Sequence, residues 1–110
     1  MEEKIIQMVI YYVLAVYEKK NMESCIEIIN LIIAMVKNEE TKADRLLNNF
    51  PIEHPVSKLY KEIKKMNKDE FIKSLENCKE KFIDYKGDKV DFSKIENEKE
   101  VEELSKKILK

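Results

Sequence analysis

The sequence predicts an all-α protein, a compact bundle of five to six helices around a central apolar helical hairpin (about 2–19 and 25–37). One Gly and two Pro among 110 residues leave too few turn residues for a sandwich or barrel. The run Ile5–Tyr17, interrupted only by Gln7, would be apolar on every side as a helix and must therefore be enclosed. Later segments repeat their apolar residues at helical spacing, so they predict amphipathic outer helices.

The chain is expected to form a single domain over residues 1–110, because no repeat or linker divides it. Apolar residues make up 44% of the sequence and charged residues 39%, which indicates a core with a well-solvated surface. A chain of this length can bury one core without metal or disulfide support.

The two helices of the predicted hairpin have recognisable ends. The first carries acidic residues at its start and lysines at its end, as the helix dipole favours. Ser24 and Glu27 fit a capping box for the second, in which only Glu27 and Asn30 interrupt the apolar run. We expect the two helices to pack antiparallel, with the rest of the chain wrapped around them.

A short third helix is predicted over Lys42–Asn49, with Thr41 as its N-cap and Pro51 after its end. Pro55 suits the first position of the next helix, whose apolar residues recur between Val56 and Met66 on one face.

Asn67, followed three residues later by Glu70, predicts the start of a helix over Lys68–Ile83. Its expected inner face consists of Phe71, Ile72, Leu75, Cys78, Phe82 and Ile83.

The segment Tyr85–Phe92 contains the only Gly of the chain and is either a loop or a short hairpin about Gly87–Asp88. We favour the loop because an isolated two-stranded hairpin is marginal in water. The last helix starts either with Ser93 and Glu96 or with Asn97 and Glu100. Its core face is expected to be Val101, Leu104 and Ile108.

No residue is predicted to be catalytic, no metal ligand or cofactor is expected, and the protein is predicted not to be an enzyme. His54 is the only histidine and has no Cys or carboxylate pair at ligand spacing, so a loop or helix-cap role is favoured over a base or metal ligand. Cys25 and Cys78 fall at core positions and are expected to be buried, unreactive thiols.

Three polar residues interrupt the first two helices: Gln7, Glu27 and Asn30. They would line a small-molecule pocket if they were buried between these helices. The alternative is a thin stripe that faces solvent, and their spacing on one helix face permits both interpretations.

The best-defined surface feature is a lysine stripe that recurs at three and four residues along one predicted helix. It could meet nucleic acid, a membrane surface or an acidic protein, although an ordinary solvated face is the more common explanation. Its residues are Lys58, Lys61, Lys64, Lys65 and Lys68. The last helix carries the opposite charge, with Glu96, Glu98, Glu100, Glu102 and Glu103.

The function expected from these features is protein–protein interaction, as a small helical adaptor, regulator or inhibitor. Apolar surface left on the first two helices would also support a homodimer. The alternative is a nucleic-acid-associated protein that contacts phosphates through the lysine stripe. The net charge of −1 and the single Arg, Arg45, argue against this alternative.

No membrane span is expected, because the run Ile5–Tyr17 is shorter than the ~20 apolar residues that a spanning helix requires. Glu2 and Glu3 stand where a signal peptide would have basic residues. We therefore expect a cytoplasmic protein, in the host cytoplasm if it is virus-encoded. The composition, rich in Lys, Asn and Ile, is also compatible with a phage- or plasmid-encoded inhibitor.

Overall fold

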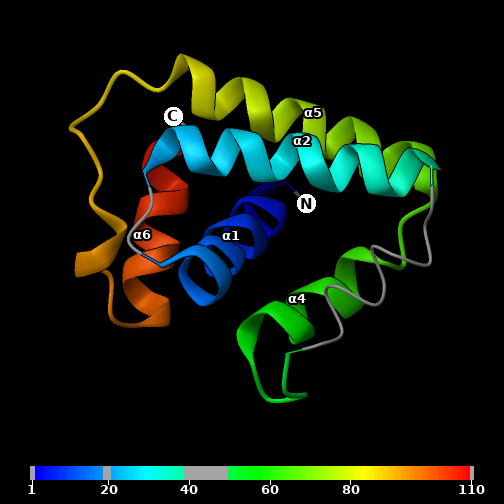
Figure 1. Ribbon diagram of the computed structural model, residues 1–110, viewed down its shortest axis with the longest axis horizontal. Coiled ribbons are helices and arrows are strands. Elements are labelled where there is room, and N and C mark those ends of the chain that lie inside the picture. The colour runs from blue at the N-terminus through cyan, green and yellow to red at the C-terminus, as the bar shows by residue number, and fades with distance from the viewer. Residues whose placement is uncertain (1, 19–20, 39–49, 110) are drawn as a thin grey trace.

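The computed structural model describes residues 2–18, 21–38 and 50–109, and these form five α-helices without a strand. The predicted all-α bundle is confirmed (Figure 1). The predicted helix Lys42–Asn49 lies outside the described residues. The α-helices are α1 (Glu2–Tyr12), α2 (Met22–Asn38), α4 (Pro55–Ile63), α5 (Lys68–Asp84) and α6 (Glu98–Leu109). A π-helical segment, η1 (Val13–Tyr17), follows α1, and a 3-10 turn, η2 (Phe92–Lys94), precedes α6.

The first helix, α1, lies at the centre of the bundle. It packs against α4, α5 and α6 and less extensively against α2. Successive residues of a helix point about 100° apart, so a run of buried neighbours means that most sides of the helix are covered. The enclosure predicted from the apolar run is confirmed for most of α1, with Lys4 exposed and Gln7 and Tyr11 half-buried along the remaining side. The buried residues of α1 are Ile5, Ile6, Met8, Val9, Ile10 and Tyr12.

The second helix, α2, packs principally against α5, and the two run antiparallel (Figure 1). Its buried residues include Ile28, Ile29 and Ile32, whereas Glu27 and Asn30 are exposed. We expected the rest of the chain to wrap both helices of the hairpin. The other helices cover most of α1, whereas one side of α2 stays exposed. Of the two alternatives for Glu27 and Asn30, a pocket lining and a solvent-facing stripe, the exposure of both residues agrees with the stripe.

The predicted capping box at Ser24 and Glu27 is wrong, because α2 starts at Met22. The side-chain oxygen of Asn21 accepts a hydrogen bond from the backbone N–H of Ser24 at 3.2 Å. Asn is among the strongest N-cap residues, and here it stands three residues ahead of the predicted cap.

The end of α1 widens into the π-helix η1, which the sequence did not predict. A π-helix bonds residues five apart, and the rings of Tyr12 and Tyr17 lie 6.1 Å apart at this spacing. Tyr12 is buried, and Tyr17 is 39% exposed. Glu18 follows with a φ of 26°, so the backbone leaves the helix there in a conformation that residues with a side chain rarely adopt.

The helix α4 starts at Pro55, as predicted, and its N-cap is His54. The imidazole Nδ1 of His54 accepts a hydrogen bond from the backbone N–H of Val56 at 3.1 Å. The helix-cap role expected for His54 is thus confirmed. The helix ends at Ile63, before the predicted Met66, because the Met66 N–H bonds to the Ile63 carbonyl in a tighter turn.

Replacing His54 with Ala is expected to lower the free energy of unfolding by about 1 kcal/mol, since the Val56 N–H would lose its cap. His54→Asn restores a capping oxygen and is the matched control, expected to recover most of this loss. Urea unfolding followed by circular dichroism measures both. Equal losses in the two variants would mean that ring contacts with Phe50 and Tyr11 outweigh the cap.

The two later helices have the predicted N-caps. Asn67 accepts a hydrogen bond from the Glu70 N–H at 2.8 Å, and Asn97 accepts one from the Glu100 N–H at 3.0 Å. The second of the two alternatives for the start of the last helix is therefore correct. All three predicted core residues of α6 are buried. On α5, Ile83 was predicted to face inward, but it is 54% exposed, because it points about 100° around the helix from the buried Phe82.

The segment between α5 and α6 is a loop, as favoured from the sequence, and it forms no strand pair. Phe92 anchors it, with its side chain fully buried. A Cβ at Gly87 would collide with the Tyr85 ring, so this position accepts only glycine without a shift of that ring. In the described part of the chain, no helix is long and apolar enough to cross a bilayer.

Candidate functional site

The five lysines of the predicted stripe are all exposed, but they do not share one helix. Lys58 and Lys61 lie on α4, Lys64 and Lys65 follow its end, and Lys68 opens α5. The prediction of a continuous ridge on a single helix is wrong, because α4 ends at Ile63.

Two contacts within the chain also involve this basic region. Glu62 pairs with Lys4 at 2.5 Å, which lowers the pKa of Glu62 through the hydrogen bond and the positive charge of Lys4. The Lys68 ammonium donates to the carbonyl of Lys37 at 3.3 Å and so joins α5 to α2. The basic residues near the α4–α5 turn therefore contribute partly to internal contacts.

The outer side of α2 forms a second candidate surface, which we name the α2 face. Its residues recur at three and four positions, so they lie within one stripe of the helix. They are Glu23, Glu27, Asn30, Leu31, Ala34 and Lys37, all of them exposed. Leu31 is 42% exposed, a large value for a leucine near the middle of a helix.

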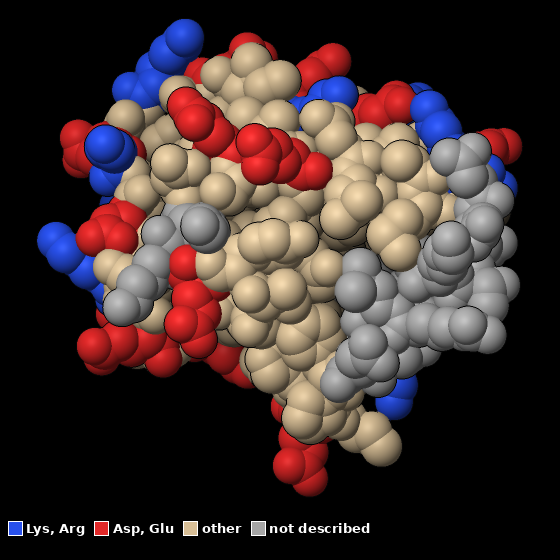
Figure 2. Space-filling view, in the orientation of Figure 1, with Lys and Arg blue, Asp and Glu red and all other residues tan. Residues whose placement is uncertain are grey.

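The end of the first helical segment adds further apolar surface. Val16 is 47% exposed and Tyr17 39% exposed in η1, and this segment contacts α2. Figure 2 shows acidic atoms over the N-terminal half of α2 and a broad uncharged region beside them. Exposed apolar area of this kind is typical of surfaces that bind proteins.

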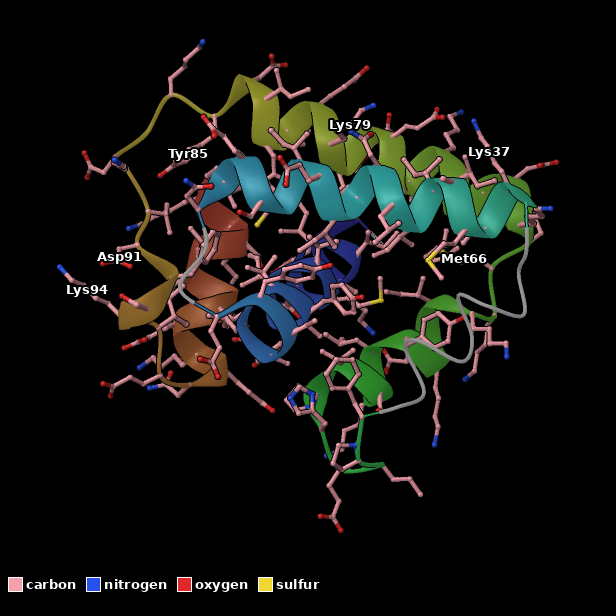
Figure 3. The ribbon with its side chains drawn as sticks, in the orientation of Figure 1. Lys37, Met66, Lys79, Tyr85, Asp91 and Lys94 are labelled. Atoms are coloured by element: carbon pink, nitrogen blue, oxygen red, sulfur yellow. The ribbon has the colours of Figure 1, made fainter. Side chains whose placement is uncertain are left out.

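Two residues of the α2 face, Asn30 and Lys37, have polar contacts with α5. The Lys79 ammonium of α5 donates to the side-chain oxygen of Asn30 at 3.1 Å, and Figure 3 shows Lys79 beside α2. The Lys37 ammonium lies 3.7 Å from the Glu76 carboxylate, with about half of each side chain exposed. An exposed pair of this kind contributes little stability, so Lys37 can also engage another charge.

The two cysteines and His54, the residues considered for chemistry from the sequence, occupy structural positions. Burial raises the pKa of the Cys25 thiol to about 12, and it raises the pKa of the Cys78 thiol further. Since the thiolate is the reactive form, both are unreactive near neutral pH. His54 uses its Nδ1 lone pair as a helix cap. No three His, Cys, Asp or Glu side chains of the described chain lie close enough to hold a metal ion.

Two open hollows of the surface have mixed linings. One, of about 340 Å³, brings Tyr11 and His54 near Glu98 between the starts of α4 and α6 and the end of α1. The other, of about 570 Å³, lies beside the loop after α5 and is lined by lysines and aspartates, with Tyr85. Neither combines a nucleophile with a base, so neither indicates a reaction.

The pKa of Tyr11 is raised from 10.0 to about 12 by burial and by the charges of Glu98 and Glu102. The pKa of Tyr12 is raised to about 12 by burial and by Tyr17. A phenol whose pKa is higher in the folded state contributes stability that is complete below pH 10 and is lost as the pH rises to about 12.

We therefore expect the folded protein to lose stability between pH 10 and about 12, because the pKa values of Tyr11 and Tyr12 are raised to about 12 in the folded state. Phenolate absorbance against pH measures the titration, and Tyr12→Phe should remove one late step. A single step near pH 10 for all tyrosines would contradict this burial.

No family model matches the chain, and comparison with curated proteins and with solved structures found no significant match.

The α2 face was only partly visible in the sequence. Glu27 and Asn30 were recognised as exceptions in an apolar helix, but Leu31 and Ala34 were counted with the core. A helical projection centred on Ala34 would have placed all four residues on one side.

Proposed function

We propose that this is a small, non-catalytic helical protein that acts by binding another protein, as an adaptor, regulator or inhibitor. The α2 face and the exposed residues of η1 form the binding surface. The observation that carries the proposal is the exposure of three large apolar side chains, Val16, Tyr17 and Leu31, on η1 and α2, two segments that contact each other. Two free, buried cysteines are compatible with action in a reducing compartment such as the cytoplasm.

The chemistry of this surface defines the partner. An apolar centre at Leu31 and Ala34 requires an apolar patch on the partner, since burial of such area drives association. Glu23 and Glu27 favour a basic group at one end of that patch, and Lys37 favours an acidic group at the other.

Site-specific photo-crosslinking tests the proposal. A photoreactive amino acid at position 31 is expected to capture a defined protein, whereas the same group at position 61, on α4, is not. With the captured protein purified, Leu31→Glu should weaken binding by about tenfold or more. Lys61→Glu combined with Lys65→Glu is the matched surface control and should leave the affinity unchanged. Binding that survives Leu31→Glu and is lost in the lysine variant would overturn the proposal.

A second candidate function is nucleic-acid binding, favoured by the exposure of all five lysines near the α4–α5 turn. Phosphate contacts would make the affinity for DNA or RNA fall steeply with salt. The same variant, Lys61→Glu with Lys65→Glu, should then abolish binding at low salt. Absence of binding by the unmodified protein, or binding that the variant retains, eliminates this candidate.

A further inference from the structure

The charges of the α2 face follow an order along the helix. Glu23 and Glu27 occupy its N-terminal half, Asn30, Leu31 and Ala34 its middle, and Lys37 its C-terminal end. On α2 itself the stripe therefore has an acidic end, an uncharged centre and a basic end, and the Lys79 ammonium of α5 lies beside that centre at Asn30.

The spacing within this stripe is symmetric. Seven residues separate Glu23 from Asn30, and seven separate Asn30 from Lys37. At 1.5 Å per residue, each charge lies about 10 Å along the helix axis from Asn30. A two-fold axis through Asn30 and perpendicular to the helix would place Glu23 of each copy level with Lys37 of the other copy.

We propose that the α2 face binds a second copy of this chain, with the two α2 helices antiparallel about a two-fold axis at Asn30–Leu31. This inference rests on the proposed function and names the partner of the same surface. A two-fold contact uses the same patch on both copies, which a stripe with an acidic and a basic end satisfies. Parallel helices would instead set Glu23 against Glu23 and Lys37 against Lys37, which is repulsive.

The contacts within each chain permit this arrangement. The Lys37 side chain is half exposed beside Glu76, so it can meet a second carboxylate from the other copy. Ala34 is small and exposed, so it allows the two helices to approach closely near the axis. Leu31 of each copy would lie next to the axis and lose its exposure to water.

The size of the surface sets the expected strength. One helix against one helix buries less than the roughly 800 Å² per partner of a standard stable interface. We therefore expect a reversible dimer with a dissociation constant on the order of micromolar. Sedimentation velocity from about 1 μM to about 1 mM should show the shift from monomer to dimer.

Charge exchange tests the pairing. Glu23→Lys and Lys37→Glu, each alone, should weaken dimerisation by about tenfold, since each turns two attractive contacts into repulsive ones. The double variant, Glu23→Lys with Lys37→Glu, should restore it to within about threefold. Urea unfolding of each variant shows that the monomer stays folded, because Lys37→Glu also faces Glu76 within its own chain.

Crosslinking tests the position of the axis. A short bismaleimide should join two copies of Leu31→Cys, but not two copies of Lys61→Cys. Glu23→Cys should be joined only when it is mixed with Lys37→Cys. The unmodified protein is a suitable background because Cys25 and Cys78 are fully buried.

Two outcomes would overturn the dimer. One is a monomer throughout the concentration range, and the other is a dimer that neither the charge variants nor Leu31→Glu affects. If position 31 then photo-crosslinks to a different protein, the proposed function stands and only the identity of the partner is wrong. If position 31 captures neither a second copy nor another protein, both proposals fail.

Discussion

Replacing Val9 with Asp is expected to unfold the protein or to lower its free energy of unfolding by about 4 kcal/mol or more. Val9 is fully buried near the centre of α1, on a side of the helix that other helices cover. A carboxylate there would lose its hydration without gaining a partner. A loss of this size is comparable with the whole stability of a small domain.

The matched control is Leu31→Asp on α2. Leu31 is 42% exposed, so a carboxylate at this position stays hydrated, and a loss of less than about 1 kcal/mol is expected. Urea unfolding by circular dichroism, at a protein concentration below that of dimerisation, compares the two. Similar losses at both positions would contradict the enclosure of α1 by the other helices.

The second large effect is expected on α5. Leu75→Ala should lower the free energy of unfolding by about 2–5 kcal/mol, because Leu75 is fully buried and its truncation leaves a cavity. Ile83→Ala removes a similar volume from the same helix, but Ile83 is 54% exposed, so its loss should stay below about 1 kcal/mol.

Thermal unfolding followed by circular dichroism gives an independent measure of the α5 pair. For a domain of about 100 residues, 1 kcal/mol corresponds to a shift of about 4–8 °C in Tm. The order of the two Tm values is the critical observation. A lower Tm for Ile83→Ala than for Leu75→Ala would mean that Ile83, and not Leu75, lies on the buried side of α5.

The sequence predicted the features that depend on local chemistry. The apolar run of α1 could only be stable if it was enclosed, and the Asn67 and Asn97 caps act on backbone N–H groups three residues away. Pro55 and His54 are likewise local signals, since both concern the first turn of α4. Features of this kind are encoded within a few residues.

Features that depend on competition or on distant packing were not predicted. Ser24 and Asn21 are both good caps, and the choice between them depends on how much of α2 packs on α5. The π-helical end of α1 has no sequence signature of its own. The break of the lysine stripe at Ile63 likewise depends on the tight turn that leads into α5.

The candidate site was the least predictable part. Composition pointed to the lysines because charge is visible in a sequence, whereas the exposure of Leu31 is not. Whether an apolar residue of α2 faces α5 or water depends on the position of α5, more than thirty residues further along the chain. A helical projection groups the residues of the α2 face, but which side of α2 is exposed follows only from the positions of the helices.

The central position of α1 has a consequence for biosynthesis. The helix is synthesised before the helices that cover it, α4, α5 and α6. Until α6 emerges, the nascent chain presents a nearly unbroken apolar segment to water, the type of segment that aggregates or recruits chaperones. The order of synthesis and the order of burial are thus opposed in this fold, and α1 can reach its native environment only after translation has passed residue 109.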